Sequence, residues 1–479
     1  MNPATPHAPL STEDMHKIHA TSLAILEQTG MQLDHQDVRS RLRDAGALVD
    51  DTTQRVRFPP QMVAAALRQT PSKINLAGRD PAYDRQVNSQ SPFIFRHATG
   101  LTMIFEPQAN QCRKAVSQDQ RTLSILCDAL PHIDLAAPLT LQDTPPKTAD
   151  LHATKILLEC QRKHFMNLTM GAKNMRYQVE MQLAVRGTRE AMCRRPLFHP
   201  IVCVISPLYL PEEDLDILLI AGEYGLPLKI PVLSMMGASA PATIAGTLAL
   251  GNAEVIGSQT ILQTLFPGTP SFYYFGPSIM EMKKGNSIYG SPENMLLESG
   301  LVQMGSDFYK LPTESMCFFS DGVVREQVMF QKGTRGLLSA LAGANIIGGA
   351  GGLDGGMAAC FPQLVIDSDI AGMLRALFSG FAVDSEALAL DVVNRVGPRG
   401  HFLLDRHTLD QIHKHTPYAP SVFEWTNYVS WKMDPKELWE RAQAQADQLM
   451  TAHEVPPLPA DVLRELDRII TAADRDIAG

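Results

Sequence analysis

The chain has 479 residues, of which 45% are hydrophobic and 19% charged, and its formal net charge is −9 at pH 7. This composition is typical of a globular enzyme with a large core, and the acidic balance argues against nucleic-acid binding. The sequence has no long apolar run and no basic-then-apolar start, so we expect neither a membrane span nor export.

The cysteines and histidines show no metal-binding pattern. Seven scattered cysteines, at positions 112, 127, 160, 193, 203, 317 and 360, include no CxxC pair and predict reduced thiols in the cytoplasm. The pairs His16/His19 and His413/His415 have no cysteine or carboxylate at zinc-motif spacing. We therefore expect no bound metal.

The first 118 residues predict small, mixed elements. Ser11 and Asp14 form a capping-box pattern that opens an amphipathic helix over 11–30, and a second short helix is predicted at 59–71. Residues 91–106, "SPFIFRHATGLTMIFE", predict a β-hairpin with Gly100 near its turn. We expect residues 1–118 to form a helical and hairpin cap that contributes no barrel repeat.

From about residue 120, short apolar runs alternate with helical stretches. The runs are "HIDLAAPLTL", "HFMNLTM", "FHPIVCVISPL", "LKIPVLSMM", "SFYYFGPSIM", "MCFFSD" and "NIIGGAGG", and the helices are predicted at 146–161, 174–190, 211–224, 241–265, 291–306 and 325–343. This alternation predicts an α/β fold with a parallel sheet. Seven strands favour a (β/α)₈ TIM barrel over 119–395 with one strand unplaced, followed by a helical tail over 396–479. A doubly wound open sheet is the alternative.

The stretch "ANIIGGAGGLDGG", residues 344–356, places six glycines after a predicted strand. In a barrel, the loops after the strands form the face that carries active sites. Bare backbone there has two interpretations, since it either admits a large flat group or allows a tight turn against a helix.

Several motifs together resemble the trimethylamine methyltransferase superfamily over about residues 10–450. They are "STEDMHKIHATSLAILEQTGMQLDH", "PSKINLAGRDP", "SDGVVREQVMFQKGTRGLLSALA", "GANIIGGAGGLDGG", "LVIDSDIAGMLRALFSG" and "GHFLLDRHTL". The resemblance implies a barrel methyltransferase that moves a methyl group from an amine to the cobalt of a corrinoid held by a small partner protein. The glycines that would admit the corrin ring are Gly348, Gly349, Gly351, Gly352 and Gly355.

The founding members of that family use pyrrolysine at a position that falls within Cys317–Val324 here, where this chain has standard residues. The resemblance then implies the branch associated with quaternary amines. Glycine betaine, which would yield dimethylglycine, is the first choice, and carnitine, γ-butyrobetaine and proline betaine are alternatives.

Methyl transfer from a quaternary ammonium is an in-line displacement that needs orientation more than acid–base chemistry. Aromatic faces bind such a cation, and the candidates are Tyr274, Phe319 and Phe361. Asp321 would attract the cation or cap the next helix, and Gln327 would orient polar groups. For a substrate carboxylate, the candidate donors are Arg96 and His97.

Three alternatives concern assembly and activity. The tryptophans of "FEWTNYVSWKMDPKELWE", residues 423–440, predict an oligomer interface or an anchored tail helix, and the family resemblance implies a homo-oligomer. Lys310 of "DFYKLP" would serve as the nucleophile of a Schiff-base barrel. A non-catalytic betaine-binding protein is the third reading.

Overall fold

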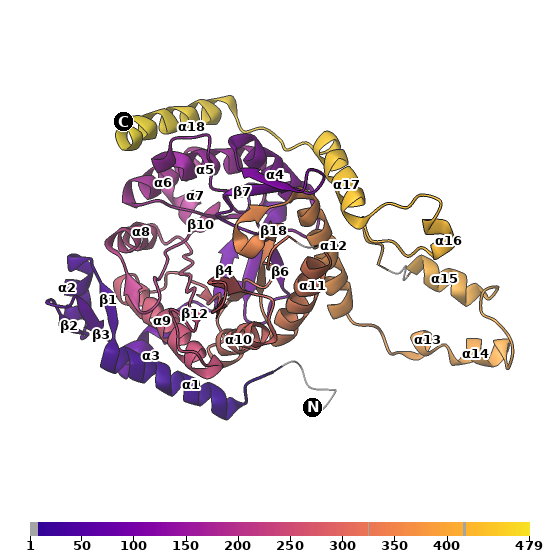
Figure 1. Cartoon of the computed structure of the whole chain (residues 1–479), viewed down its shortest axis with the longest axis horizontal. Helices are drawn as coiled ribbons and strands as arrows, with labels where there is room; N and C mark the ends of the chain where they lie inside the picture. The colour runs from indigo at the N-terminus through magenta and orange to yellow at the C-terminus, as the bar shows by residue number, and fades with distance from the viewer. Residues whose placement is uncertain (1–7, 324, 415–417) are drawn as a thin grey trace.

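The computed structural model describes residues 8–323, 325–414 and 418–479 and shows an α/β fold. Short strands lie at the centre of Figure 1 and helices surround them. A segment over residues 379–414 and 418–435, here called the arm, extends away from the rest of the chain (Figure 1). No helix in the described ranges is both long and apolar enough to span a bilayer.

The central strands pair in parallel. β6 (Ile94–His97) pairs with β17 (Ile346–Ala350), β17 with β16 (Thr313–Ser315), and β16 with β13 (Tyr273–Tyr274). The series continues through the pairs Arg96–Leu135, Ala136–Phe165, β9 (Phe165–Asn167) with β10 (Phe198–Pro200), Ile201–Lys229 and Leu228–Ser271. Pairing thus follows a ring of eight segments in the described chain, built of short ladders and single bridges.

The predicted hairpin over 91–106 is wrong. β6 pairs with β17 instead of β7 (Met103–Glu106), and β7 pairs antiparallel with β8 (Gln111–Lys114). Residues 94–97 therefore supply the ring strand that the sequence left unplaced. The pattern of apolar residues predicted both strands correctly, but it contains no information on the partner of each strand.

The helices that follow the ring strands agree closely with those predicted. They are α5 (Ala149–Cys160), α6 (Ala172–Arg186), α8 (Glu212–Glu223), α9 (Ile244–Leu265), α10 (Pro292–Val302) and α11 (Arg325–Ala342). The sequence analysis did not predict α12 (Phe361–Phe378), which follows β17. The "MCFFSD" strand is displaced, because β16 ends at Ser315, before this motif begins.

The amino-terminal elements cover one side and one end of the ring. α1 (Thr12–Ala24) begins at the predicted capping box of Ser11 and Asp14 and packs on α9. α2 (Gln36–Asp44), α3 (Pro60–Gln69) and a small sheet of β1 (Met31–Leu33), β2 (Leu48–Asp50) and β3 (Arg55–Arg57) follow. β4 (Lys73–Leu76) and β5 (Arg85–Asn88) form a hairpin that shares an apolar cluster with Ile94 and Ile346. These two isoleucines begin their strands, so the hairpin closes the amino end of the ring.

The carboxyl-terminal part begins with the arm and ends in two packed helices. The arm carries α13 (Ser385–Leu388), α14 (Leu390–Val396), α15 (Arg406–Lys414) and α16 (Tyr428–Trp431). α17 (Leu438–Ala452) packs on α12 and on α4 (Ser117–Ala129), and α18 (Ala460–Ala473) packs on α6. The arm therefore projects between two segments that are firmly part of the body.

Candidate active site

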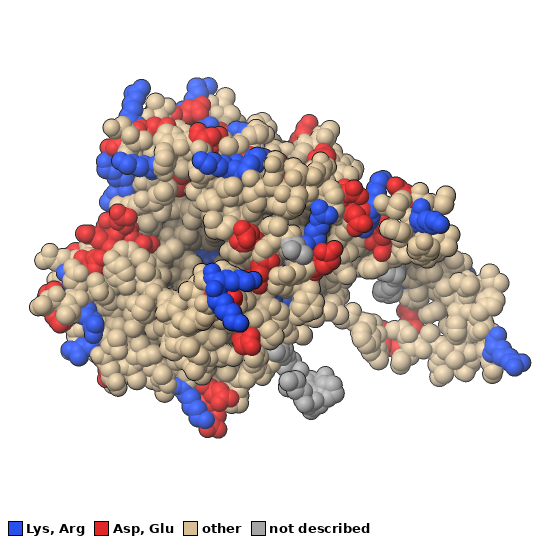
Figure 2. All heavy atoms as spheres, in the orientation of Figure 1, with Lys and Arg blue, Asp and Glu red and all other residues tan. Residues whose placement is uncertain are grey.

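The carboxyl ends of the ring strands and the loops after them, here called the mouth, carry exposed apolar side chains. Met170 follows β9, Ile205 and Leu233 follow the next two ring segments, and Met357 follows β17, each between 47% and 53% exposed. Figure 2 shows this face hollowed near its middle. Four large apolar side chains are thus exposed on the loops at this end of the ring.

A charged cluster lies inside the ring below the mouth. Nη2 of Arg96 on β6 lies 2.6 Å from Oε1 of Glu314 on β16, and Nζ of Lys229 lies 2.8 Å from the same oxygen. All three side chains are at most 2% exposed. Burial, together with the nearby charge of Arg96, lowers the pKa of Lys229 to about 7. The sequence did not point to Lys229 or Glu314, although a lone lysine in the apolar run 226–232 was a visible signal.

Tyr274 points into the ring and Tyr273 points out of it, as strand alternation requires. The hydroxyl of Tyr273 donates to Asn252 on α9 over 2.8 Å. The ring of Tyr274 lies below the mouth with Nζ of Lys229 only 3.8 Å from its centroid. One face of Tyr274, a candidate for binding the substrate cation, is therefore occupied by a cation of this chain.

The glycine stretch is packed against the chain itself. A Cβ added at Gly348 would lie 2.5 Å from Nη2 of Arg96, and one at Gly352 would lie 2.8 Å from Cβ of Ala98. Gly349 and Gly351 have φ angles of 110° and 74°, in the region that favours glycine. All four are buried, while Gly355 is partly exposed near the ring of Tyr289. The tight-turn interpretation accounts for Gly348, Gly349, Gly351 and Gly352, because a Cβ added at any of them would lie within 3.1 Å of neighbouring atoms of the chain.

Asp321 clamps a neighbouring loop. Its Oδ1 accepts from the backbone N–H of Tyr289 and its Oδ2 from that of Gly290, both at 2.8 Å. Gln331 donates to Oδ2 over 3.0 Å, whereas the exposed Gln327 reaches only the backbone oxygen of Asp321. Both carboxylate oxygens of Asp321 thus hold residues 289–290 in place.

Arg96 and His97 do not come together. Neighbours in a strand point to opposite faces, so Arg96 enters the ring while the ring of His97 lies beside Gly351 and Leu364 of α12. Burial lowers the pKa of His97 to about 3, which keeps it neutral. The predicted pair of carboxylate donors is therefore split, and only Arg96 lies within the ring.

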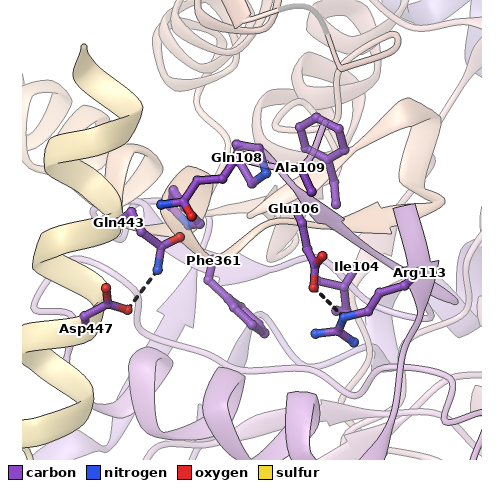
Figure 3. A pocket seen from close by; sticks show the side chains of 11 residues that line it. Ile104, Glu106, Gln108, Ala109, Arg113, Phe361, Gln443 and Asp447 are labelled. Carbon is purple, nitrogen blue, oxygen red and sulfur yellow. Dashed lines mark hydrogen bonds and ion pairs between the residues drawn. The ribbon is translucent and has the colours of Figure 1, made fainter. Parts of the chain in front are cut away.

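Phe319 and Phe361, the other two predicted aromatic residues, pack in surroundings different from those of Tyr274. Phe319 packs beside Gly352 and Gly356, with its ring centroid 6.4 Å from that of Tyr289. Phe361 begins α12 and lines a pocket of about 340 Å³ beside the β7–β8 hairpin (Figure 3). Gln443 and Asp447 of α17 also line this pocket, and the side-chain amide of Gln443 donates a hydrogen bond to Asp447 (Figure 3). Phe361 thus belongs to an outer pocket.

The competing nucleophile is misplaced. Lys310 is exposed and precedes β16, at the amino end of that strand, whereas barrel chemistry is built at the carboxyl ends. Among the residues that the structure describes, no three His, Cys, Asp or Glu side chains gather as a metal site. His415 of the pair His413/His415 lies outside the described residues.

Buried polar groups also order the mouth. Glu254 on α9 accepts from the backbone N–H of Leu208 at 2.7 Å and from the hydroxyls of Ser206 and Ser234. Burial raises the pKa of Glu254 to about 7. This carboxylate, which sequence analysis missed, fastens the loop that carries the exposed Ile205 to the loop after the next ring segment.

Solved structures resemble this fold. The monomethylamine methyltransferase (MtmB) of Methanosarcina barkeri matches with a TM-score of 0.53 and 10% identity, over 94% of this chain and 90% of that one. Its hydroxylamine complex matches with a TM-score of 0.54. At this identity the likeness defines the fold class alone, which is a TIM-barrel-like α/β fold.

The sequence comparisons define the family. The trimethylamine methyltransferase (MTTB) model matches residues 1–478. Trimethylamine methyltransferase MttB of Desulfitobacterium hafniense (strain DSM 10664 / DCB-2) is 29% identical over 466 residues, covering 97% of this chain and 93% of the relative. A glycine betaine methyltransferase of D. hafniense (strain Y51) is 28% identical over 472 residues, covering 98% and 97%. The chain belongs to the trimethylamine methyltransferase (MTTB) family and is an amine methyltransferase.

Proposed function

We propose that this enzyme moves a methyl group from a quaternary amine, glycine betaine as first choice, to Co(I) of a corrinoid carried by a small partner protein. The observation that carries the proposal is the full-length match to amine methyltransferases, one of which is named a glycine betaine methyltransferase. The described residues Cys317–Val323 are all standard, as expected for the branch without pyrrolysine. Carnitine, γ-butyrobetaine and proline betaine remain the alternative substrates.

The chemistry fits a site without an acid–base pair. The N–CH₃ bond breaks with its electron pair staying on nitrogen, so the leaving group is a neutral tertiary amine and no proton is required. The methyl acceptor supplies the electron pair of the new bond. The protein's task is to align nitrogen, methyl and acceptor, and such positioning contributes roughly 7–11 kcal/mol toward lowering the barrier.

We interpret the ring of eight paired segments as a (β/α)₈ barrel that carries the active site for this reaction. The proposed domains are a cap over residues 1–118, a catalytic domain over 119–395 and a helical tail over 396–479. Because β6 pairs with β17, the first barrel strand is contributed by the capping region. The substrate would enter from the mouth, since the β4–β5 hairpin closes the opposite end.

The methyl acceptor would approach the exposed apolar side chains of the mouth. Met170, Ile205, Leu233 and Met357 offer a broad apolar rim that suits a corrin ring presented by its carrier protein. In this arrangement Gly355, with its neighbour Met357, would lie on the docking rim. The buried glycines at 348–352 would support that rim from below.

For the substrate head group we favour Phe319. The face of Tyr274 is partly taken by Lys229, and Phe319 with Tyr289 forms an aromatic pair near the rim. Asp321 would act indirectly, because it fixes the backbone of Tyr289. Each aromatic face contributes about 0.5–2 kcal/mol to binding a quaternary ammonium.

We further propose that the arm is covered by a second copy of this chain. Its exposed apolar side chains include Phe381 (90%), Leu404 (85%) and Met433 (84%), while Trp439 outside the arm packs over Arg325. The arm begins with acidic side chains at Asp384, Glu386 and Asp391 and continues with basic ones at Arg395 and Arg399, so two copies could pair these charges. Replacing Phe381 and Leu404 by aspartate should lower the mass measured by light scattering, and an unchanged mass would contradict this interface.

All seven cysteines are free thiols, which supports a cytoplasmic location.

One assay tests the proposed reaction. The protein is mixed with a reduced corrinoid protein and a panel of quaternary amines, and the visible spectrum is followed for loss of Co(I). Glycine betaine should give the fastest loss and should yield dimethylglycine. If every amine leaves the spectrum unchanged while glycine betaine binds, the protein is a betaine-binding barrel and the proposed reaction is wrong.

A further inference from the structure

The charged cluster inside the ring is unbalanced. Arg96 and Lys229 contribute two cations, and Glu314 contributes one carboxylate. A buried charge without a partner is strongly unfavourable in protein interiors. The cluster therefore holds one positive charge more than its own residues neutralise whenever Lys229 is protonated.

The hydrogen bonds of the cluster are also incomplete. Both cations contact Oε1 of Glu314, and Oε2 has no partner among the described residues. An ammonium group has three N–H donors, and Oε1 of Glu314 satisfies one of those on Lys229. A guanidinium has five, of which Arg96 directs one to the backbone oxygen of His97 and others to Glu314. Donors are thus in excess at this point inside the ring.

The surroundings of Lys229 hold no second anion among the described residues. Tyr274 from β13 presents its ring at 3.8 Å, Arg96 adds positive charge from β6, and Cys203 is a thiol whose pKa burial raises to about 11. His199 on β10 is neutral, because burial drives its pKa well below the usual value. An acidic group from outside the chain is what the cluster lacks.

Tyr274 lies between the charged cluster and the rim residue Leu233. Its hydroxyl contacts Sδ of Met316, and a Cβ added at Gly276 would touch that hydroxyl at 2.9 Å and Leu233 at 3.0 Å. Leu233 is 47% exposed at the rim. The cluster therefore lies one side chain below the solvent-facing edge of the mouth.

We propose that Lys229 and Arg96 form the recognition site for the carboxylate of a zwitterionic quaternary amine. This inference rests on the proposed function and specifies its substrate class. The surplus positive charge attracts the carboxylate and repels the ammonium group. The zwitterion is thereby oriented with its methylated nitrogen toward the mouth, where the methyl acceptor arrives.

The affinity of this site for a carboxylate should depend on whether Lys229 is protonated. The pKa of its ammonium group in the free protein is about 7, and a bound carboxylate would raise it. Binding therefore takes up protons near neutral pH. Affinity should be highest below pH 7 and should fall by up to about tenfold per pH unit above it.

The test is equilibrium binding to the full-length protein by titration calorimetry, without a corrinoid partner. Glycine betaine is compared with choline, which has the same trimethylammonium head but no carboxylate. Wild type should prefer glycine betaine. Lys229→Met should lose about tenfold to a hundredfold of its affinity for glycine betaine, with less than a twofold change for choline, and should flatten the pH dependence.

Glu314→Gln provides a control of opposite sign. It removes the only anion of the cluster and, at a pH low enough to keep Lys229 protonated in the variant, should tighten glycine betaine binding, whereas general damage to the site would weaken it. Equal affinities of wild type for the two ligands, equal losses of both in Lys229→Met, or absence of binding would overturn the inference. If Lys229 controls betaine binding but Co(I) is never consumed, the proposed reaction fails and the inference stands.

Discussion

The buried ion pair between Lys332 and Asp367 fastens the glycine stretch to two helices. Nζ of Lys332 on α11 lies 2.6 Å from Oδ2 of Asp367 on α12, and both side chains are fully buried. The same Oδ2 accepts from the backbone N–H of Gly351 at 2.7 Å, and Oδ1 accepts from Gln363 at 2.8 Å. Replacing Lys332 by methionine removes the cation and retains the apolar stem.

The free energy of unfolding should fall by about 3–5 kcal/mol in Lys332→Met, because the carboxylate of Asp367 stays buried with neutral donors only. Burial already raises the pKa of Asp367, and Lys332 is what lowers it most. Without Lys332 that pKa rises further, and a raised pKa gives stability that is lost as pH increases. The variant should therefore be closer to wild type at pH 5 than at pH 8.

The double variant Lys332→Met, Asp367→Asn removes both charges and keeps an acceptor for Gly351. It should recover to within about 1.5 kcal/mol of wild type. Urea unfolding followed by circular dichroism at pH 5 and pH 8 measures both variants. A single variant that loses less than about 1 kcal/mol, or a double variant as unstable as the single one, would refute this account of the pair.

Three further predictions concern the site. Gly348→Ala should weaken glycine betaine binding more than choline binding, because the added Cβ would displace the guanidinium of Arg96. Gly333→Ala is the control: it adds a Cβ in open space on α11 and should leave both affinities unchanged in the same titration. Met170→Asp should raise the KM for the corrinoid protein by about tenfold without altering amine affinity, and equal rates over a partner titration would contradict the docking rim. Glu254 has a pKa raised by burial to about 7, so its stabilising contribution is complete below about pH 4.5 and lost as pH rises through 7. The melting temperature of Glu254→Gln relative to that of wild type should therefore be higher at pH 8 than at pH 5.

Capping residues and apolar periodicity predicted the helices and most strands, because these features depend on neighbouring residues in the sequence. The capping box at Ser11 and Asp14 predicted the start of α1, and apolar periodicity located α5, α6, α8, α9, α10 and α11 within a few residues. The partner of Ile94–His97 was missed, because pairing with β17 joins residues about 250 positions apart. Nothing local to a strand records such a partner.

The candidate site was less accessible to sequence reasoning, for a similar reason. Alternation showed that Tyr273 and Tyr274 face opposite ways, and it also separates Arg96 from His97 once they form a strand. The convergence of Lys229 and Glu314 on Arg96 depends on three strands that are neighbours only across the ring. Lys229, the lone lysine of an apolar run, could be noticed in the sequence, but its neighbours in the cluster, Arg96 and Glu314, lie in distant parts of the sequence.

The glycine stretch and the charged cluster are parts of one arrangement. A side chain at position 348 would occupy the space of the Arg96 guanidinium and of Oε1 of Glu314, so the bare backbone is what allows these ions to meet inside the ring. Three residues later, the N–H of Gly351 is held by Asp367, which anchors the same loop to α12. The loop that forms the rim at Gly355 is thus connected through buried ions to the interior. The proposed positioning at the mouth and the proposed recognition below it would consequently depend on the same few residues, and the packing around the Arg96 guanidinium explains why position 348 is a glycine.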